Sequence, residues 1–253
     1  MPADSGAPAS FAKGRAVVAS AATPASVGAA ERYVLKDFAG SSHRLLASWV
    51  RDLPPDLRVL ELGPGTAQVA RLAERKDLRW FGLEGSVDCL GALAETLSGG
   101  AIVDLERLDR LPRGFDVAVA ADLLEHLSAP EAMLRRLADA LPAGAPLLIS
   151  VPNVANVWIR LQLLCGRFPY ADRGILDRTH LVFFTRKTLE EMLARAGFAV
   201  ERRAASTIPL PLAFPHWPRV ILGALMGLLG AMTRGFPKLF GFQLLVFARR
   251  RSG

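Results

Sequence analysis

The chain has 253 residues, and because 51% of them are hydrophobic it can fill the core of one large α/β domain or at most two small ones. Its two cysteines, Cys89 and Cys165, lie far apart without a CxxC or metal-ligand spacing, which excludes a disulfide scaffold and predicts no metal site. No acidic residue follows Glu201, so the net charge of +7 comes largely from a basic and strongly apolar C-terminal segment. Such a segment favours a membrane surface over nucleic acid.

Residues 1–28 are mainly Ala, Ser, Pro and Gly, and we expect a disordered tail there. A secretory signal is the alternative, but its apolar run is weak and is followed by Pro24. We expect a single domain over residues 29–253, which begins with one or two amphipathic helices within residues 29–52.

The next stretch, residues 58–74, predicts a strand, a tight turn and a helix. Gly63 and Gly65 allow the backbone to bend sharply and to approach a ligand, and the helix start offers free N–H groups. A dinucleotide site needs a third glycine where this chain has Gln68, which disfavours a nicotinamide-dependent oxidoreductase. Glu61 would repel a pyrophosphate but attract an ammonium or a sulfonium. A structural turn without a ligand is the alternative.

This acidic-x-Gly-x-Gly turn resembles motif I of the class I S-adenosylmethionine-dependent methyltransferases. Two departures are Pro64, which stiffens the turn, and Ala67, where many members have a third glycine. The resemblance covers residues from about 31 to 250 and implies S-adenosylmethionine as the methyl donor.

A second strand is predicted over residues 78–84, and it ends on Glu84. Glu84 follows Gly63 by 21 residues, the spacing at which nucleotide sites place a carboxylate against the ribose hydroxyls. A solvated glutamate at a strand end is the alternative.

The family resemblance assigns further roles to the ends of the next two strands. At the end of the short strand at 101–104, Asp104 would accept a hydrogen bond from the exocyclic amine of adenine, and Leu105 would form a wall of the adenine pocket. The alternative is that Asp104 is an ordinary loop residue. The buried strand at 115–121 ends in Asp122, which we assign to the cofactor site. The Glu125-His126 pair resembles the family's pocket rim, where His126 would act as a base or line the pocket. The alternative is a histidine that bonds only to the backbone.

Residues 176–185 resemble a block found in small-molecule methyltransferases, including enzymes of cell-envelope sugar and lipid metabolism. We interpret the polar cluster that ends in His180 as the lining of an acceptor pocket, and His180 as the second candidate base, since imidazole titrates near neutral pH. Alternatively, Asp177 and Arg178 pair with each other and hold the loop.

A hydrophobic insertion over about 208–238 precedes the last strand. Its predicted helix, residues 220–232, reaches about 20 Å and cannot cross a hydrocarbon core of about 30 Å. The insertion is therefore expected to be a lid, a core helix or a contact with a membrane surface.

These patterns predict an α/β fold, a Rossmann-like doubly wound seven-stranded mostly parallel sheet with a helical insertion. The resemblance implies a methyltransferase that acts on a small-molecule, sugar or lipid acceptor. We expect it in the cytoplasm, free or at the inner face of the membrane. Two alternatives are a non-catalytic membrane-associated protein that keeps the fold and an RNA methyltransferase. We do not expect a base-amine enzyme of nucleic acids, because Asp122-Leu123 stands where those have an Asn/Asp-Pro-Pro-aromatic turn.

Overall fold

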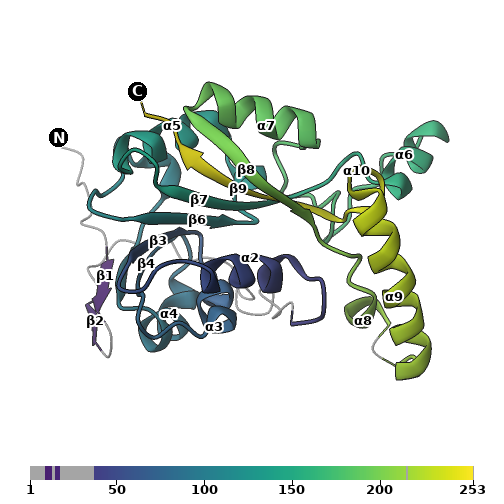
Figure 1. The fold of residues 1–253 in the computed structure, drawn as a ribbon, viewed down its shortest axis with the longest axis horizontal. Coiled ribbons are helices and arrows are strands. Elements are labelled where there is room, and N and C mark those ends of the chain that lie inside the picture. The colour runs from purple at the N-terminus through teal and green to yellow at the C-terminus, as the bar shows by residue number, and fades with distance from the viewer. Residues whose placement is uncertain (1–8, 13–14, 18–36, 215, 253) are drawn as a thin grey trace, which may run out of the picture.

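The computed structural model describes residues 9–12, 15–17, 37–214 and 216–252. Its strands form one mixed sheet in the order β2-β1-β5-β4-β3-β6-β7-β9-β8 (Figure 1). The strands are β1 (Ala9–Ala12), β2 (Arg15–Val17), β3 (Arg58–Leu62), β4 (Arg79–Glu84), β5 (Gly99–Ile102), β6 (Val117–Ala121), β7 (Pro146–Pro152), β8 (Phe198–Ala205) and β9 (Gln243–Arg250).

The seven strands β3 to β9 form the predicted doubly wound sheet. Strands β3 to β7 pair in parallel, whereas β9 runs antiparallel to both β7 and β8. The strand order reverses at β3, which has β4 on one side and β6 on the other. In open α/β sheets a ligand binds at such a reversal, beyond the carboxyl ends of the strands. The glycine turn follows β3 and therefore lies at this position.

Helices cover both faces of the sheet, with α2, α3 and α4 on one face and α5 and α7 on the other (Figure 1). Strand β6 shows why: Val117, Val119 and Ala121 pack into the core beside α2 to α4, while Ala118 and Ala120 pack into the core beside α5 and α7. A strand buried on both faces has to be apolar throughout. These helices are α2 (Ser42–Arg51), α3 (Gln68–Ala73), α4 (Leu90–Thr96), α5 (Pro130–Ala140) and α7 (Arg186–Arg195).

The structure differs from the expected tail at two stretches. β1 pairs antiparallel with β2 and with β5, so a hairpin extends the edge of the sheet where we expected irregular chain. The rest of the tail, at 1–8, 13–14 and 18–28, lies outside the described residues.

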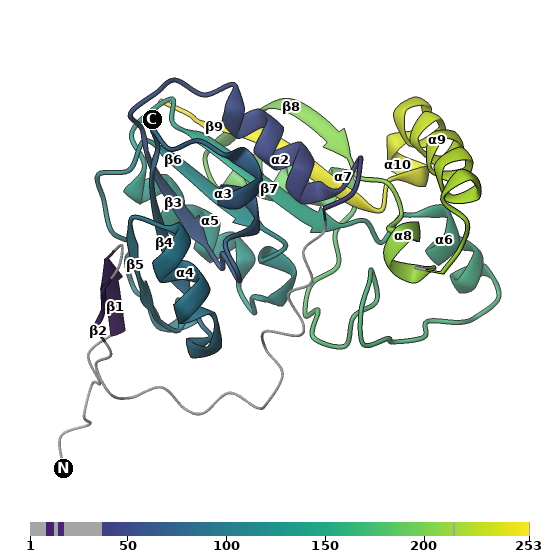
Figure 2. The ribbon, with the colours of Figure 1, turned by 90° about the horizontal axis from the view of Figure 1, so that it is seen from below.

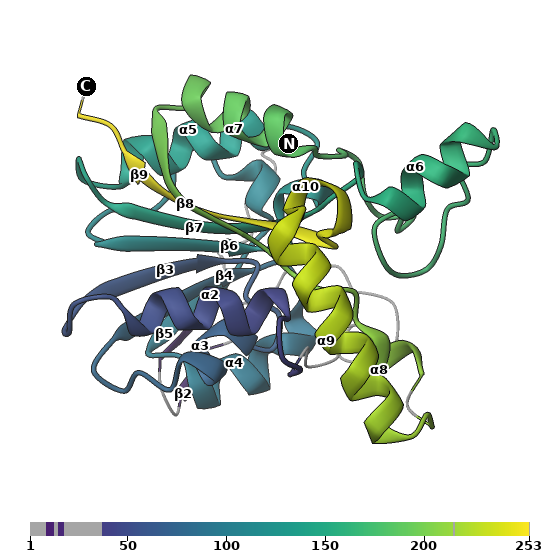
Figure 3. The same ribbon diagram turned by 45° about the vertical axis from the view of Figure 1, so that its right-hand side comes forward.

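The insertion forms α8 (Leu210–Ala213), α9 (Arg219–Gly235) and α10 (Pro237–Phe240) between β8 and β9. Helix α9 has 17 residues, four more than the thirteen predicted. Among the described residues, no helix is both long enough and apolar enough to cross a membrane. Figures 2 and 3 show α9 and α8 extending away from the sheet, at the same end of the molecule as α6 (Val157–Leu164).

Two asparagines after β7 hold this insertion. The side-chain nitrogen Nδ2 of Asn153 donates to the carbonyl oxygens of Lys238 at 3.1 Å and Gly241 at 2.9 Å, and Nδ2 of Asn156 donates to Gly241 at 2.9 Å. Asn153 directly follows Pro152, the last residue of β7. The insertion is therefore attached at the carboxyl edge of the sheet, the edge that also carries the glycine turn.

Candidate active site

The turn after β3 has a backbone that favours glycine. Gly63 and Gly65 have φ angles of 62° and 54°, in the left-handed region where a side chain is strained. A Cβ on Gly63 would also lie 3.0 Å from Cδ1 of Leu123. Ala67, at the family's third glycine, adopts the same region with a φ of 57°, and α3 begins one residue later.

Glu84 ties this turn to the end of β4. Its Oε2 accepts a hydrogen bond from the N–H of Gly65 at 2.8 Å, and its Oε1 accepts one from the N–H of Ser86 at 2.9 Å. Only 4% of Glu84 is exposed, so the alternative of a solvated glutamate is wrong. Its predicted contact with ribose hydroxyls stays a prediction, but its place beside the glycine turn suits that role.

Glu61 is the second buried carboxylate of this site. It is 1% exposed, and its Oε2 has no hydrogen-bond partner among the described residues. Burial, and secondly the charge of Glu84, raise the pKa of Glu61 to about 8. A cationic group that donates a hydrogen bond to Glu61 would reduce the free-energy cost of burying its carboxylate form.

Asp104 and Leu105 follow β5, which spans Gly99–Ile102 rather than the predicted 101–104. Asp104 accepts a hydrogen bond from the N–H of Glu106 at 3.0 Å and pairs with Nε of Arg107 at 3.1 Å. Leu105 is buried in the core beside α5. The Asp104 carboxylate is more than half exposed, so it is accessible to a ligand, although its contact with adenine stays a prediction.

Asp122 begins the turn after β6 and holds a φ of 51°, which is strained for a residue other than glycine. Its N–H donates to the carbonyl oxygen of Ser150 at 3.0 Å and to Oγ of Ser150 at 3.1 Å, and this hydroxyl donates to Oδ1 of Asp122. Ser150 is a fully buried polar residue of β7. Ser150 was not among the predicted site residues, although it is a polar residue inside the apolar run 146–152.

The structure brings the two candidate bases together. His126 lies at the end of the short 3₁₀ helix η3 (Leu124–His126), and His180 lies in the loop before α7. The N–H groups of Leu181 and Val182 donate to the carbonyl oxygen of Glu125 at 2.7 and 3.1 Å and so hold that loop against η3. The two imidazole rings then meet edge to face, with their centroids 4.9 Å apart. Burial lowers the pKa of His180, and the nearby His126 acts in the same direction.

The other residues of the polar cluster stabilise the loop before α7. Oδ1 of Asp177 accepts hydrogen bonds from the N–H and the hydroxyl of Thr179, at 2.9 and 2.7 Å. Arg178 forms an exposed pair with Asp172 at 3.1 Å rather than with Asp177, so the predicted alternative pairing is wrong.

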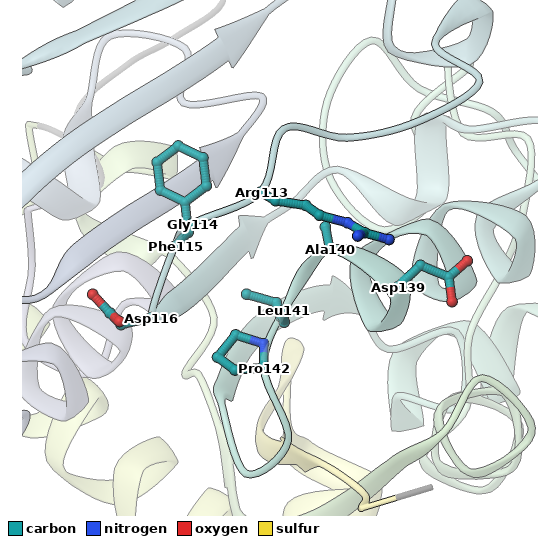
Figure 4. Close-up of a pocket in the computed structure, with 8 residues that line it drawn as sticks. All are labelled: Arg113, Gly114, Phe115, Asp116, Asp139, Ala140, Leu141 and Pro142. Carbon is teal, nitrogen blue, oxygen red and sulfur yellow. The ribbon is translucent and has the colours of Figure 1, made fainter.

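A surface pocket of about 410 Å³ lies away from the glycine turn and the two histidines (Figure 4). Its lining comes from the segment before and at the start of β6 and from the end of α5: Arg113, Gly114, Phe115, Asp116, Asp139, Ala140, Leu141 and Pro142. This is the amino edge of the parallel strands, opposite the glycine turn. Because ligands of doubly wound sheets bind at the carboxyl edge, we place the active site at the turn and not in this pocket.

The comparisons with known proteins agree with this geometry. A family model described as a methyltransferase domain matches residues 31–202, more than half of the chain. The chain belongs to this methyltransferase family. It is a class I S-adenosylmethionine-dependent methyltransferase, as the resemblance of its motifs implied. A search of curated proteins found no match.

Solved structures of methyltransferases share the fold. An S-adenosylmethionine-dependent methyltransferase from Thermotoga maritima is 16% identical with a TM-score of 0.57, over 87% of this chain and 94% of its own. One from Mesorhizobium loti is 19% identical with a TM-score of 0.54, over 83% and 99%. The magnesium protoporphyrin IX methyltransferase of Synechocystis, solved with bound S-adenosylhomocysteine, is 15% identical with a TM-score of 0.55, over 83% and 84%.

The residues of the methyltransferase fit S-adenosylmethionine, its cofactor. The cofactor carries an ammonium group and a sulfonium, and the buried Oε2 of Glu61 lacks a hydrogen-bond donor that an ammonium can supply. Glu84 lies beside the turn, where ribose hydroxyls are bound in this class of fold. Gly63 allows the turn to pack closely against Leu123, because a Cβ there would lie 3.0 Å from Cδ1 of Leu123.

Proposed function

We propose that this methyltransferase transfers the methyl group of S-adenosylmethionine to a lipid, or to a sugar or small molecule held at a membrane surface. The observation that supports this acceptor class is a cluster of exposed apolar side chains beyond the carboxyl edge of the sheet. Among the described residues, every large hydrophobic side chain that is exposed lies between Trp158 and Phe236.

The two most exposed of these side chains come from helices α6 and α9. Leu164 on α6 and Val220 on α9 are both 84% exposed, and Trp158 and Leu228 accompany them on the same two helices. Apolar surface of this kind on an otherwise well-packed domain marks a contact with a partner or a membrane. We name it the apolar rim, and define it as the exposed apolar residues of α6 and α9: Trp158, Leu161, Leu163, Leu164, Val220, Ile221 and Leu228.

The charges around the apolar rim favour an anionic membrane as its partner. Arg219, Arg234 and Lys238 are exposed on or beside α9, and no acidic residue follows Glu201 in the sequence. Trp217 and Phe236 are exposed at the two ends of α9. Aromatic and basic side chains beside an apolar face are typical of helices that lie in the membrane interface. We therefore propose that the protein binds peripherally to the inner face of the membrane.

The proposed mechanism depends mainly on placement. S-adenosylmethionine supplies a methyl group that is already activated by the positive sulfur, with a neutral leaving group. Glu61 and Glu84 hold the donor, and the geometry of the site sets the distance between the methyl group and the acceptor atom. His126 and His180 lie on the acceptor side, where a neutral imidazole can take a proton from the acceptor. The membrane contact presents the acceptor to this edge of the sheet.

Vesicle binding tests the proposal. We expect the full chain to sediment with vesicles of phosphatidylglycerol and phosphatidylethanolamine, and to methylate an extract of membrane lipids with labelled S-adenosylmethionine. Leu164→Glu and Val220→Glu should each reduce both signals about tenfold, because they place a charge in the contact. Arg113→Glu, at the opposite edge of the sheet, is the matched control and should change neither. A full chain that neither binds these vesicles nor methylates the lipid extract would refute the membrane acceptor, whereas binding and methylation that survive both variants would refute the apolar rim as the contact.

A further inference from the structure

Three potential metal ligands gather at the acceptor side of the site. Glu125 and His126 belong to η3, and His180 comes from the loop before α7. One potential ligand atom from each of Glu125, His126 and His180 lies within 4.8 Å of the other two. The sequence predicted no metal site, because no spacing along the chain connects His180 with the other two.

The hydrogen bonds of both histidines leave one ring nitrogen able to bind a cation. Nδ1 of His126 lies 3.2 Å from the carbonyl oxygen of Thr179, and Nδ1 of His180 lies 3.0 Å from that of Ile175. A carbonyl oxygen only accepts, so each Nδ1 carries the hydrogen and each Nε2 carries a lone pair. Metal-binding imidazoles usually have this arrangement, in which a backbone carbonyl or a carboxylate fixes the ring and its tautomer.

The backbone holds the three side chains in place before any ion binds. The N–H groups of Leu181 and Val182 bond to the carbonyl oxygen of Glu125, and so connect the His180 loop directly to the Glu125-His126 pair. An ion with bonds of about 2.1 Å keeps its ligand atoms about 3 to 4.2 Å apart. The potential ligand atoms of the cluster lie at most 4.8 Å apart, which is close to the spacing that such an ion requires. His126 is exposed, so one side of the cluster is open to an acceptor.

We propose that Glu125, His126 and His180 bind a divalent first-row transition ion such as Mn²⁺, Fe²⁺, Co²⁺ or Zn²⁺. Two imidazoles and one carboxylate suit these ions, and three protein ligands leave coordination positions open. A hard ion bound only by oxygen, such as Ca²⁺, does not match this ligand set.

The position of the cluster assigns the ion to the acceptor. Leu123, directly before η3, lies against Gly63 of the cofactor turn, so the cluster lies next to the cofactor site. This role rests on the proposed function: an acceptor hydroxyl that binds to the ion becomes more acidic and is held in one orientation. Its oxygen forms the new bond to the methyl group, the carbon–sulfur bond breaks with its electron pair on sulfur, and the hydroxyl proton leaves to water. With the ion bound, His126 and His180 act as ligands and the ion replaces them in activating the acceptor hydroxyl; in the metal-free protein they are the bases of the proposed function.

Cobalt binding tests the site without any acceptor. The full chain, treated with EDTA and dialysed, is titrated with Co²⁺ and followed by calorimetry and by its visible absorption. We expect one Co²⁺ per chain and a change in the visible d–d bands of Co²⁺ on binding. His126→Ala, His180→Ala and Glu125→Gln should each weaken binding by about tenfold or more. His216→Ala removes an exposed histidine outside the cluster and should bind Co²⁺ like the wild type.

The controls separate this proposal from the proposed function. Each variant is first shown to be folded by circular dichroism and by its binding of S-adenosylmethionine, and the exposed His126 gives a variant that the fold should tolerate. Folded protein that binds no Co²⁺, or variants that bind it unchanged, would overturn the metal site and leave the membrane acceptor in place. If the protein binds Co²⁺ at the cluster but neither binds vesicles nor methylates membrane lipids, the metal site is supported and the lipid acceptor is refuted.

Discussion

Glu61 differs from the surrounding residues because it is a carboxyl group that is buried without a hydrogen bond to Oε2. Between its ordinary pKa of 4.5 and its raised pKa of about 8, the free enzyme keeps a proton on Glu61. An ammonium group beside it favours the carboxylate. We therefore expect the binding of S-adenosylmethionine to release a proton from Glu61, and the affinity to rise as the pH increases through this window.

Calorimetry at pH 6.5 in two buffers with different ionisation enthalpies measures this proton. The heat of S-adenosylmethionine binding should differ between the buffers for the wild type, and should be the same in both for Glu61→Gln. The pH lies below the region near 8 in which the amino group of the ligand itself titrates. A wild-type heat that does not depend on the buffer would contradict the assignment of Glu61 to the ammonium group.

Glu84 combines two tasks at one carboxylate, since it accepts hydrogen bonds from Gly65 and Ser86 and is predicted to accept more from the ribose. Glu84→Gln keeps the shape but loses the charge. Hydrogen bonds to a charged group contribute about 1.5 to 3 kcal/mol, so we expect the Kd for S-adenosylmethionine to rise about 10- to 100-fold. Glu74→Gln, at an exposed position after α3, is the matched control. An unchanged Kd for Glu84→Gln would remove Glu84 from the cofactor site.

At the scale of elements, the attachment of the insertion depends on Asn153. Its Nδ2 bonds to two carbonyl oxygens, those of Lys238 and Gly241, which remain without this donor if the amide is removed. We expect Asn153→Ala to lower the free energy of unfolding by about 1 to 3 kcal/mol. Asn153→Asp keeps the Oδ1 acceptor for the N–H of Ala155 but replaces the donor, so it should not restore stability.

Urea unfolding followed by circular dichroism measures both variants. Full stability of Asn153→Asp would show that the two carbonyl contacts do not hold the insertion.

Helix α9 is longer than the sequence predicted. Arg219 and the residues from Thr233 to Gly235 are helical, although the apolar pattern alone suggested a helix over 220–232. The basic and small residues at the two ends continue the backbone hydrogen bonds without continuing the apolar face.

At the scale of the whole molecule, the same Glu61 links folding to pH. The folded chain holds a proton on Glu61 that the unfolded chain has lost between pH 4.5 and about 8, so this group lowers the free energy of unfolding as the pH rises through that window. Below pH 4.5 both states are protonated and the effect vanishes. We expect Glu61→Gln to match the wild type at pH 4.5 and to be more stable than the wild type at pH 8.

Urea titrations of both proteins without ligand, at these two pH values, check the sign. Other titrating groups change the free energy of unfolding of both proteins equally. The difference in this free energy between wild type and Glu61→Gln therefore reports Glu61 alone. A wild type that is the more stable protein at pH 8 would contradict the burial of an uncompensated carboxyl group at position 61.

The sequence by itself determined the elements of the sheet and the glycine turn, and its resemblance to the methyltransferase family implied the class of cofactor. These follow from local patterns, because an apolar run buried on both faces, a left-handed turn and a carboxylate at a strand end are each set by neighbouring residues. The hairpin of β1 and β2 did not follow, since an Ala- and Ser-rich stretch forms strands there only through pairing with β5.

Only the tertiary structure decided the acceptor side. His180 lies 54 residues after His126, and the two rings meet because the backbone of residues 181 and 182 bonds to the carbonyl oxygen of Glu125. The burial of Glu61 and the gathering of exposed apolar side chains on α6 and α9 likewise depend on how distant elements pack. Contacts between distant segments leave no periodic pattern in the sequence, so the sequence named both histidines, and only the fold showed that they share one site with Glu125.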